Sequence, residues 1–330
     1  MKFLYNLSFG FLFKKHISII CFAPIKYKNN NLRPMNNIKK ILYGYFGFKN
    51  AGDEVILEIA KRHFPDSRVL SSKHRRESFL VSKSTVIFPG GSLLQDRTSL
   101  KSLFFYLSVI SFFKKRGCKV YMLNQGIGPI KSELGKRLMY RILRSVDRLT
   151  VRTKGDYIFL SKKLQNVELG ADTAFLLEPG EPMENSERNA VVFKTVYREK
   201  YPKIPMEWDI LAFSKRDMAN LLNIYEKKRI IPVYMMKANE MIDMLSKYER
   251  VYAEPLHAII LSYLAGVKEI FTMPYDIKVE YFTKEIKSDI NLIDDFKKIF
   301  DPMFNPLKNN RKHLSKLKQR AAFGLEIDDV

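Results

Sequence analysis

The sequence contains few cysteines and no uncharged hydrophobic stretch of membrane-spanning length. Its two cysteines, Cys21 and Cys118, are far apart, and neither has the C-x-x-C or metal-ligand spacing of a redox or zinc site. A disulfide framework is therefore excluded, and we expect free thiols in a reducing compartment. The uncharged part of the most apolar segment, 103–113, is shorter than the roughly 20 residues that cross a bilayer, so we expect it to pack in a core.

Acidic residues are scarce, because 35 Asp and Glu accompany 57 Lys and Arg, for a formal net charge of +22. A field of this sign attracts anions, which include phosphorylated substrates, anionic membranes and nucleic acids. The sequence has no arginine-rich arm, zinc module or RNA-binding aromatic signature, which argues against nucleic acid. Composition alone does not decide between phosphorylated substrates and a membrane surface as the anionic partner. No grouping of His, Cys and Asp has metal-ligand spacing, so no metal is expected.

The first 36 residues are rich in aromatics and lysine and poor in acids. Lys14 and Lys15 interrupt their apolar runs before either reaches the length of a transmembrane helix, and a small-residue cleavage site is lacking. We expect Met35 to be the true start, because a strand-forming stretch follows it. The alternative is that 1–36 form a basic-aromatic segment that touches the inner membrane leaflet.

From residue 37 onward, short β-branched or aromatic runs alternate with amphipathic stretches. This alternation predicts an α/β protein with mostly parallel sheets covered by helices. A polar break at 179–189 separates two Rossmann-like domains, 37–178 and 190–300, which face a cleft and precede a basic C-terminal segment, 301–330. The predicted strands are 39–45, 85–88, 119–123, 149–152, 190–196, 229–234 and 268–272. The predicted helices are 53–62, 100–116, 133–146, 156–163, 207–225, 239–247, 256–265 and 305–320.

A glycine-rich turn at 44–54 joins the first predicted strand to the first predicted helix. It lacks the G-x-G-x-x-G spacing of a dinucleotide site. Glycine allows close backbone approach and free amides at a helix start attract anions, so Asn50, Gly52 and Asp53 are candidate ligand contacts. The alternative is that Asn50 and Asp53 cap the helix.

Other predicted strands also end in polar or glycine-rich turns. Gly90 and Gly91 suit an anionic or polyhydroxylated ligand, and Asp96 is interpreted either as a base toward a sugar hydroxyl or as a helix cap. Single polar residues stand in similar places further on, although plain turns or caps explain each one taken alone: Gln125, Arg152 and Asp172.

His257 opens an otherwise apolar predicted helix at 256–265. An imidazole titrates near neutrality, so this residue is a candidate for proton transfer. Taken alone, a structural or capping histidine is the more conservative interpretation. The helix is predicted to end at Gly266, a residue type that commonly terminates helices.

Taken together, these segments resemble the polysaccharide pyruvyl transferase family over roughly residues 38–284. The pieces that carry the resemblance stand in the family's order: GYFGFKNAGDEVIL (44–57), FPGGSLLQD (88–96), NQGIGP (124–129), VR (151–152), GADTAF (170–175), LHAIILSYLAGV (256–267) and PYDIKV (274–279).

The resemblance implies a GT-B-like pair of domains. It also implies transfer of pyruvate from phosphoenolpyruvate to two hydroxyls of a sugar, forming a cyclic ketal and releasing phosphate. The acceptor would be a sugar of a cell-surface polysaccharide or its lipid-linked precursor. No cofactor other than the phosphoenolpyruvate co-substrate is implied. The expected location is the cytoplasm, with peripheral contact to the inner membrane face as an option.

Residue roles carry over from the same pieces. His257 is expected to act as general acid or base, with Asp96 as its partner in proton transfer. The expected substrate-binding residues are Asn50, Gly52, Asp53, Gly90, Gly91, Gln125, Arg152, Asp172, Lys194, Leu256, Tyr275 and Lys278.

The chain departs from the family's pattern at two positions. Pro255 stands where the family has an arginine, and Lys194 stands where another arginine is usual. Lysine is a point charge rather than a bidentate fork, so the grip on a carboxylate is altered. Two alternatives follow: a nucleotide-sugar glycosyltransferase on a similar frame, or a catalytically degenerate member that acts as a binding subunit.

Overall fold

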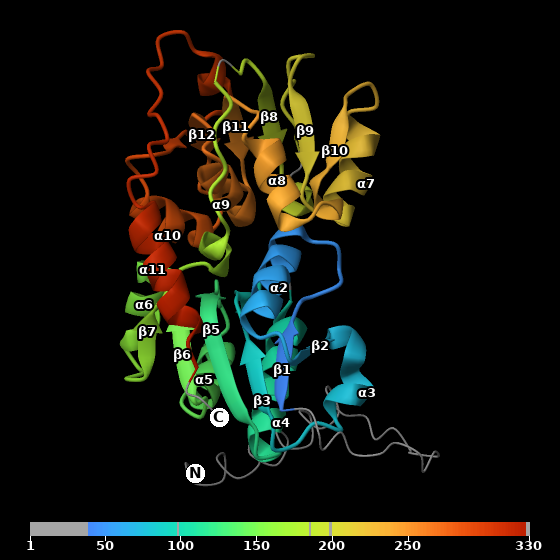
Figure 1. Ribbon diagram of the computed structural model, residues 1–330, viewed down its shortest axis with the longest axis vertical. Helices are drawn as coiled ribbons and strands as arrows, with labels where there is room; N and C mark the ends of the chain where they lie inside the picture. The colour runs from blue at the N-terminus through green and yellow to red at the C-terminus, as the bar shows by residue number, and fades with distance from the viewer. Residues whose placement is uncertain (1–38, 98, 185, 198–199, 328–330) are drawn as a thin grey trace, which may run out of the picture.

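The computed structural model describes residues 39–97, 99–184, 186–197 and 200–327. The expectations for 1–36 therefore lie outside the described residues. Figure 1 shows two α/β halves stacked along the long axis, each with a sheet that carries helices on both faces. The predicted α/β class with two Rossmann-like domains is confirmed.

The first sheet has seven strands, all paired in parallel, in the order β2-β1-β3-β5-β6-β7, with β4 pairing to β5. Both faces of its central strands are buried, which explains continuous apolar runs such as TVIF in β3. The strands are β1 (Lys40–Gly44), β2 (Ser67–Ser71), β3 (Thr85–Phe88), β4 (Gly91–Leu94), β5 (Lys119–Ile127), β6 (Arg148–Val151) and β7 (Val167–Leu169). The helices of this half are α2 (Ala51–His63), α3 (Arg75–Ser78), α4 (Leu100–Lys115), α5 (Glu133–Leu143) and α6 (Lys154–Ser161), with short turns η1 (Ser72–His74) and η2 (Thr173–Leu176).

The second sheet has six parallel strands in the order β10-β9-β8-β11-β12-β13. The strands are β8 (Asn189–Val192), β9 (Asp209–Ala212), β10 (Ile230–Pro232), β11 (Arg250–Ala253), β12 (Glu269–Thr272) and β13 (Asn291–Leu292). Its helices are α7 (Lys215–Ile224), α8 (Ala238–Leu245), α9 (Leu256–Ala265) and α10 (Ile277–Glu285), with turns η3 (Thr195–Tyr197), η4 (Val233–Met235) and η5 (Phe296–Phe300). The prediction for α9 is confirmed at both ends, and Gly266 closes it in the left-handed conformation with φ of 77°.

The single helix predicted over 207–225 is wrong. This segment holds strand β9 followed by helix α7. Ser214 separates them, because its backbone is extended and its side chain accepts a hydrogen bond from the amide of Asp217. The buried run Ile210–Leu211–Ala212 before it pairs with β8 and β10.

The C-terminal helix is α11 (Leu314–Leu325), which begins later than the predicted 305–320. The preceding segment is held as an irregular strap: the Asn309 side chain donates to the carbonyls of Tyr263 and Val267 at 3.2 and 3.1 Å. Helix α11 then returns to the first half of the molecule (Figure 1), where Thr150 donates to the carbonyl of Gly324 at 2.9 Å.

Helix α2 lies between the two sheets (Figure 1) and connects their cores. One hydrophobic cluster runs from Val55 and Ile59 of α2 to Val192 and Leu211 of the second sheet and on to α9. Burying one such side chain fully is worth about 1.5–3 kcal/mol, so each half depends on the other for stability. No helix in the described part of the chain is long and apolar enough to cross a membrane.

Candidate active site

A cavity of about 590 Å³ opens between the two halves of the molecule. The carboxyl ends of strands from both parallel sheets supply much of its lining, the usual position of ligand sites in such folds. Eight of the fourteen residues predicted from the sequence line it: Asn50, Asp53, Arg152, Lys194, Leu256, His257, Tyr275 and Lys278.

The start of helix α2 brings Asp53 into the cavity. Asn50 is the N-cap residue, because its side chain accepts a hydrogen bond from the amide of Gly52 at 3.2 Å. The capping interpretation is thus confirmed for Asn50, whereas the Asp53 carboxylate lines the cavity. Burial raises the pKa of Asp53 to about 6, even though the charges of His257, Lys278 and Arg152 favour its ionised form. A carboxyl group with this pKa can exchange protons near neutral pH.

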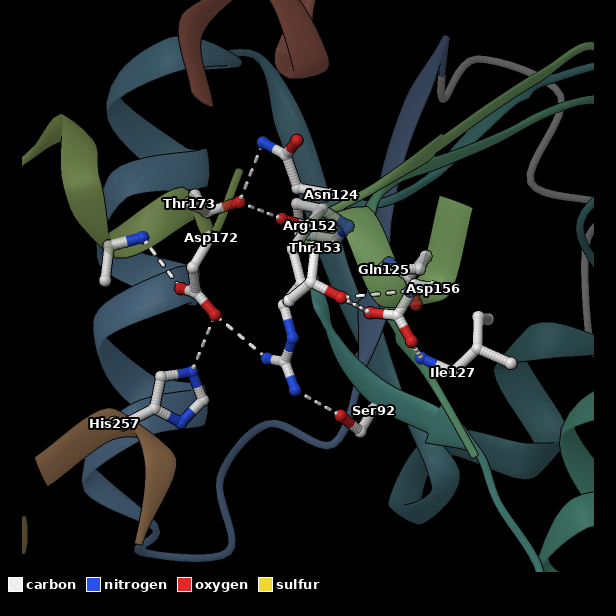
Figure 2. Close-up of polar contacts among 12 residues, drawn as sticks. Ser92, Asn124, Gln125, Ile127, Arg152, Thr153, Asp156, Asp172, Thr173 and His257 are labelled. Atoms are coloured by element: carbon white, nitrogen blue, oxygen red, sulfur yellow. Dashed lines mark hydrogen bonds and ion pairs between the residues drawn. The ribbon is translucent and has the colours of Figure 1, made fainter. Parts of the chain in front are cut away.

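His257 lies in the first turn of helix α9 and faces the first half of the molecule across the cavity. A methyl group built onto Gly52 would lie 1.8 Å from Nδ1 of His257, so only glycine leaves room for this ring against α2. Nε2 of His257 lies 3.5 Å from Oδ2 of Asp172, as Figure 2 shows. A titratable side chain of the second half, His257, therefore lies beside one of the first half, Asp172.

Asp172 is shared between His257 and Arg152 (Figure 2). Nη1 of Arg152 donates to Oδ2 of Asp172 at 2.9 Å, and Nη2 donates to Oγ of Ser92 at 2.7 Å. The side chains of Arg152 and Asp172 are only 3% and 2% exposed. Burial alone would raise the pKa of Asp172, but the charges of His257 and Arg152 outweigh it and hold that pKa below its usual range. Asp172 is thus an anion at neutral pH.

A second group of charges, which we call the cation cluster, surrounds Asp276 and consists of Arg97, Lys194 and Lys278. Oδ2 of Asp276 lies 2.5 Å from Nη1 of Arg97 and 4.0 Å from Nζ of each lysine. Asp276 also caps α10, accepting from the amide of Lys278 at 3.2 Å. Burial lowers the pKa of Lys278 to about 8 and also lowers that of Lys194. The cluster places three cations where they can attract an anion, although the charges of Asp217 and Glu254 act on Lys194 together with that of Asp276.

Comparison with known sequences assigns the chain to a family. The sequence profile of the family described as polysaccharide pyruvyl transferase matches residues 50–271, which is more than half of the chain. The chain belongs to the polysaccharide pyruvyl transferase family. No curated protein sequence shows significant similarity to it.

Solved structures with similar folds share little sequence with this pyruvyl transferase family member. A functionally uncharacterised protein from Klebsiella pneumoniae is 18% identical, with a TM-score of 0.49 and coverage of 85% of this chain and 94% of that one. The wall teichoic acid polymerase TagF is 10% identical, with a TM-score of 0.49 and coverage of 96% and 89%. An alpha-glucosyltransferase solved with UDP-glucose and DNA is 9% identical, with a TM-score of 0.41 and coverage of 86% and 91%.

Asp96, the expected proton-transfer partner, is not among the residues that line the cavity of this family member. Its Oδ2 accepts hydrogen bonds from the amides of Lys131 and Ser132, both at 2.8 Å. Asp96 therefore organises the loop before α5. The alternative expectation, that Asp96 caps the helix beginning near Ser99, is wrong, because Ser99 itself caps α4.

Several other predicted residues of this pyruvyl transferase family member shape the site without lining it. Gln125 is buried and donates to the carbonyls of Phe88 and Leu123, both at 2.9 Å. Gly91 has a φ of 89°, and a methyl group there would lie 3.4 Å from Oδ1 of Asp53. Gly90 also has a positive φ, of 143°, so this pair of residues makes a turn that favours glycine.

Sequence reasoning missed Arg97 and Asp276, although both directly adjoin motifs that it used. Arg97 follows the FPGGSLLQD piece, and Asp276 lies inside PYDIKV. A helix-capping aspartate has no distinct signature as a site residue, because its interaction with three cations arises only when the two halves fold together. Among the described residues, no group of three or more His, Cys, Asp or Glu side chains is arranged to hold a metal ion.

Proposed function

We propose that this chain transfers a pyruvyl group from phosphoenolpyruvate to two hydroxyls of a sugar in a cell-surface polysaccharide or its lipid-linked precursor, releasing phosphate. The observation that carries the proposal is a single cavity that holds the cation cluster, Arg152 and two proton-carrying side chains, Asp53 and His257. Membership of the pyruvyl transferase family supports the reaction class.

The charge distribution supports an anionic donor such as phosphoenolpyruvate. This molecule carries a carboxylate and a phosphate, and the cation cluster with Arg152 provides four positively charged side chains beside one another in the cavity. Arg97, Arg152 and Arg216 line the same cavity as Pro255 and supply guanidinium groups where the family's arginine is absent. Fixed cations aimed at the phosphate also stabilise the charge that develops as it leaves.

The proton steps can be assigned to His257 and Asp53. A hydroxyl oxygen of the sugar attacks C2 of phosphoenolpyruvate while Asp53 takes the hydroxyl proton and protonated His257 gives a proton to the C3 methylene, which becomes a methyl group. The bond between C2 and the phosphate oxygen then breaks, and phosphate leaves with the electron pair. The second hydroxyl attacks C2 and gives its proton to the now neutral His257, while Asp53 passes its proton to the released phosphate, which completes the ketal and restores both side chains.

Asp172 supports this assignment because it is the carboxylate that faces His257, at 3.5 Å. A carboxylate at this distance orients the imidazole ring. In this scheme Asp53 takes the role that the sequence assigned to Asp96, since Asp53 lines the cavity and Asp96 binds backbone amides. The cytoplasmic location and membrane contact remain predictions.

The activity is tested by incubating the protein with phosphoenolpyruvate and extracted lipid-linked sugars, and following phosphate release together with the mass of the acceptor. We predict a mass gain of one pyruvyl ketal per phosphate, and loss of both signals in His257→Ala. His63→Ala is the matched control, because this exposed histidine lies outside the cavity.

Near-normal phosphate release by His257→Ala would contradict the assignment of this residue. Release of UDP from a sugar nucleotide, with no turnover of phosphoenolpyruvate, would replace the proposal by the glycosyltransferase alternative. Binding of phosphoenolpyruvate without turnover on any acceptor would favour a binding subunit.

A further inference from the structure

Two aromatic side chains at the edge of the cavity have no role in the hydrophobic core. Tyr45 and Phe48 stack face to face, with ring centroids 4.1 Å apart and an interplanar angle of 5°. Both line the cavity, and Tyr45 is 40% exposed. Neither belongs to a hydrophobic cluster of the described residues. An aromatic stack that lines a polar cavity outside the hydrophobic core, with Tyr45 exposed and Phe48 half-buried, points to a ligand.

Lys73 covers the stack on its Phe48 side. Nζ of Lys73 lies over the ring of Phe48, 4.4 Å from its centroid. A ring has two faces, and Tyr45 covers one of those of Phe48, so Lys73 must occupy the other. The order is therefore Lys73, Phe48, Tyr45, and the face of Tyr45 that points away from Phe48 is the surface left for a ligand.

The loop that carries the stack is braced on both sides of Gly47. The amide of Gly47 donates to Oε1 of Glu54 at 2.8 Å, and Nζ of Lys73 donates to the Gly47 carbonyl. Gly47 has a φ of 79°, a conformation that favours glycine. Lys73 thus fixes the backbone of this loop and also covers one face of Phe48. The Tyr45–Phe48 stack is therefore preorganised rather than formed on binding.

The Tyr45–Phe48 stack shares the cavity with the proposed base, Asp53, and is formed by other residues than the cation cluster. Tyr45, Asp53 and Arg216 line the same cavity; burial and the charge of Asp53 raise the pKa of Tyr45, while Arg216 lowers it. The cation cluster, by contrast, is built around Asp276 and Tyr275 of the second half of the molecule. The cavity therefore holds both an aromatic stack and a cation cluster, and Asp53 lines the same cavity.

We infer that the outer face of Tyr45 is the binding platform for the pyranose ring of the acceptor sugar. The ring's axial C–H groups carry partial positive charge and pack on the negative face of an aromatic ring, while its hydroxyl edge reaches Asp53 for deprotonation. The assignment of the ring as acceptor rests on the proposed function, whereas pyranose binding at Tyr45 can be measured without any turnover.

The test is saturation-transfer NMR with methyl glycosides of glucose, galactose, mannose and N-acetylmannosamine. We expect at least one glycoside to bind the wild type, and Tyr45→Ala to weaken that binding roughly five- to tenfold, the scale of one aromatic stacking contact. Tyr45→Phe keeps the ring face and should bind within about twofold. Tyr157→Ala is the matched control, since Tyr157 is an exposed tyrosine outside the cavity.

Phosphoenolpyruvate binding, measured by calorimetry on the same variants, should be unchanged in Tyr45→Ala. If the wild type fails to bind phosphoenolpyruvate while the glycoside result holds, the proposed donor is wrong and the platform stands. The platform is overturned if no glycoside binds the wild type, if Tyr45→Ala binds like the wild type, or if only UDP shows a dependence on Tyr45.

Discussion

Asp53 is held in an environment that opposes its charge, and this makes it useful for proton transfer. Burial raises its pKa to about 6 despite the nearby cations. A base with this pKa is mostly ionised at neutral pH yet still binds a proton readily. The adjacent Gly52 and Gly91 keep the space around it free for the imidazole and for the ligand.

We predict that Asp53→Asn lowers kcat at pH 7.5 by roughly a hundredfold or more, the usual contribution of a general base. Because the ionised form is the active one, wild-type kcat should rise with pH through about 6, and this limb should disappear in the variant. A pH profile of phosphate release measures both effects. A variant that keeps the limb near pH 6 would show that another group is titrating.

Stability serves as the control for this variant. The folded-state pKa of about 6 lies above the ordinary value of 3.8, so the folded protein binds the extra proton between these values. The free energy of unfolding therefore falls as pH rises from about 4 to about 6 and stays lower above it. Asp53→Asn removes that penalty, by at most about 3 kcal/mol. Its Tm at pH 7.5 should match or exceed the wild type, so that lost activity cannot be attributed to unfolding.

Sequence alone could not decide which aspartate serves the cavity. Asp53 and Asp96 both follow a glycine-containing turn, and both were given a ligand and a capping interpretation. The decision depends on whether neighbouring backbone amides saturate the carboxylate, as Lys131 and Ser132 do for Asp96. These amides lie more than thirty residues away in the chain, so no local pattern reveals them.

The start of helix α2 is shaped by a side chain of another helix, the imidazole of His257 on α9. Replacing a helical glycine by alanine normally stabilises a helix, by up to about 1 kcal/mol. At Gly52 the added methyl group would meet His257 Nδ1 at 1.8 Å, so the ring or the helix must shift. At position 52 the helix propensity of alanine therefore favours the substitution, whereas the contact with His257 opposes it.

We predict that Gly52→Ala lowers both Tm and phosphate release in the wild-type background. In the His257→Ala background the contacts with the ring are gone and only that with Cβ of residue 257, at 2.7 Å, is left, so the same substitution should lower Tm by less. Thermal unfolding of the two single variants and the double variant forms a complete cycle. An equal effect of Gly52→Ala in both backgrounds would show that the imidazole does not pack against α2 as described.

Long periodic elements were the most predictable from sequence, and short buried ones the least. Helix α9 was placed correctly because an apolar run, a histidine start and a terminal glycine agree. Strand β9 was absorbed into a predicted helix, since four residues give too little periodicity to separate it from α7. Strands β2, β4, β7, β11 and β13 were also missed, although β3, with four residues, was predicted from its continuous apolar run.

The two halves and the C-terminal helix are fastened at one point by Arg320 of α11. Its Nε donates to the carbonyl of Gly170 at 2.7 Å, and Nη1 pairs with Oε2 of Glu285 on α10 at 2.6 Å. Glu285 also accepts from the amide of Lys154 at 2.7 Å. The Glu285 side chain is only 8% exposed, so it depends on this pairing.

We predict that Arg320→Ala lowers the free energy of unfolding by roughly 3 kcal/mol, because it leaves a buried carboxylate without its cation. Lys318→Ala is the matched control on the same helix, since its partner Glu178 is 84% exposed, and it should cost less than about 1 kcal/mol. Urea denaturation of the two variants measures the difference. Equal losses would indicate that α11 contributes through its apolar face alone.

The shared core around α2 has a consequence for how this chain can be divided. The connection between the halves is exposed at 181–184, where a backbone cut would remove no buried side chain. Yet the apolar surface that closes each half belongs to the other, since one cluster spans both. A protease that nicks the connection would leave two polypeptides behaving as one particle, and a gene split there would encode two products that need each other to fold.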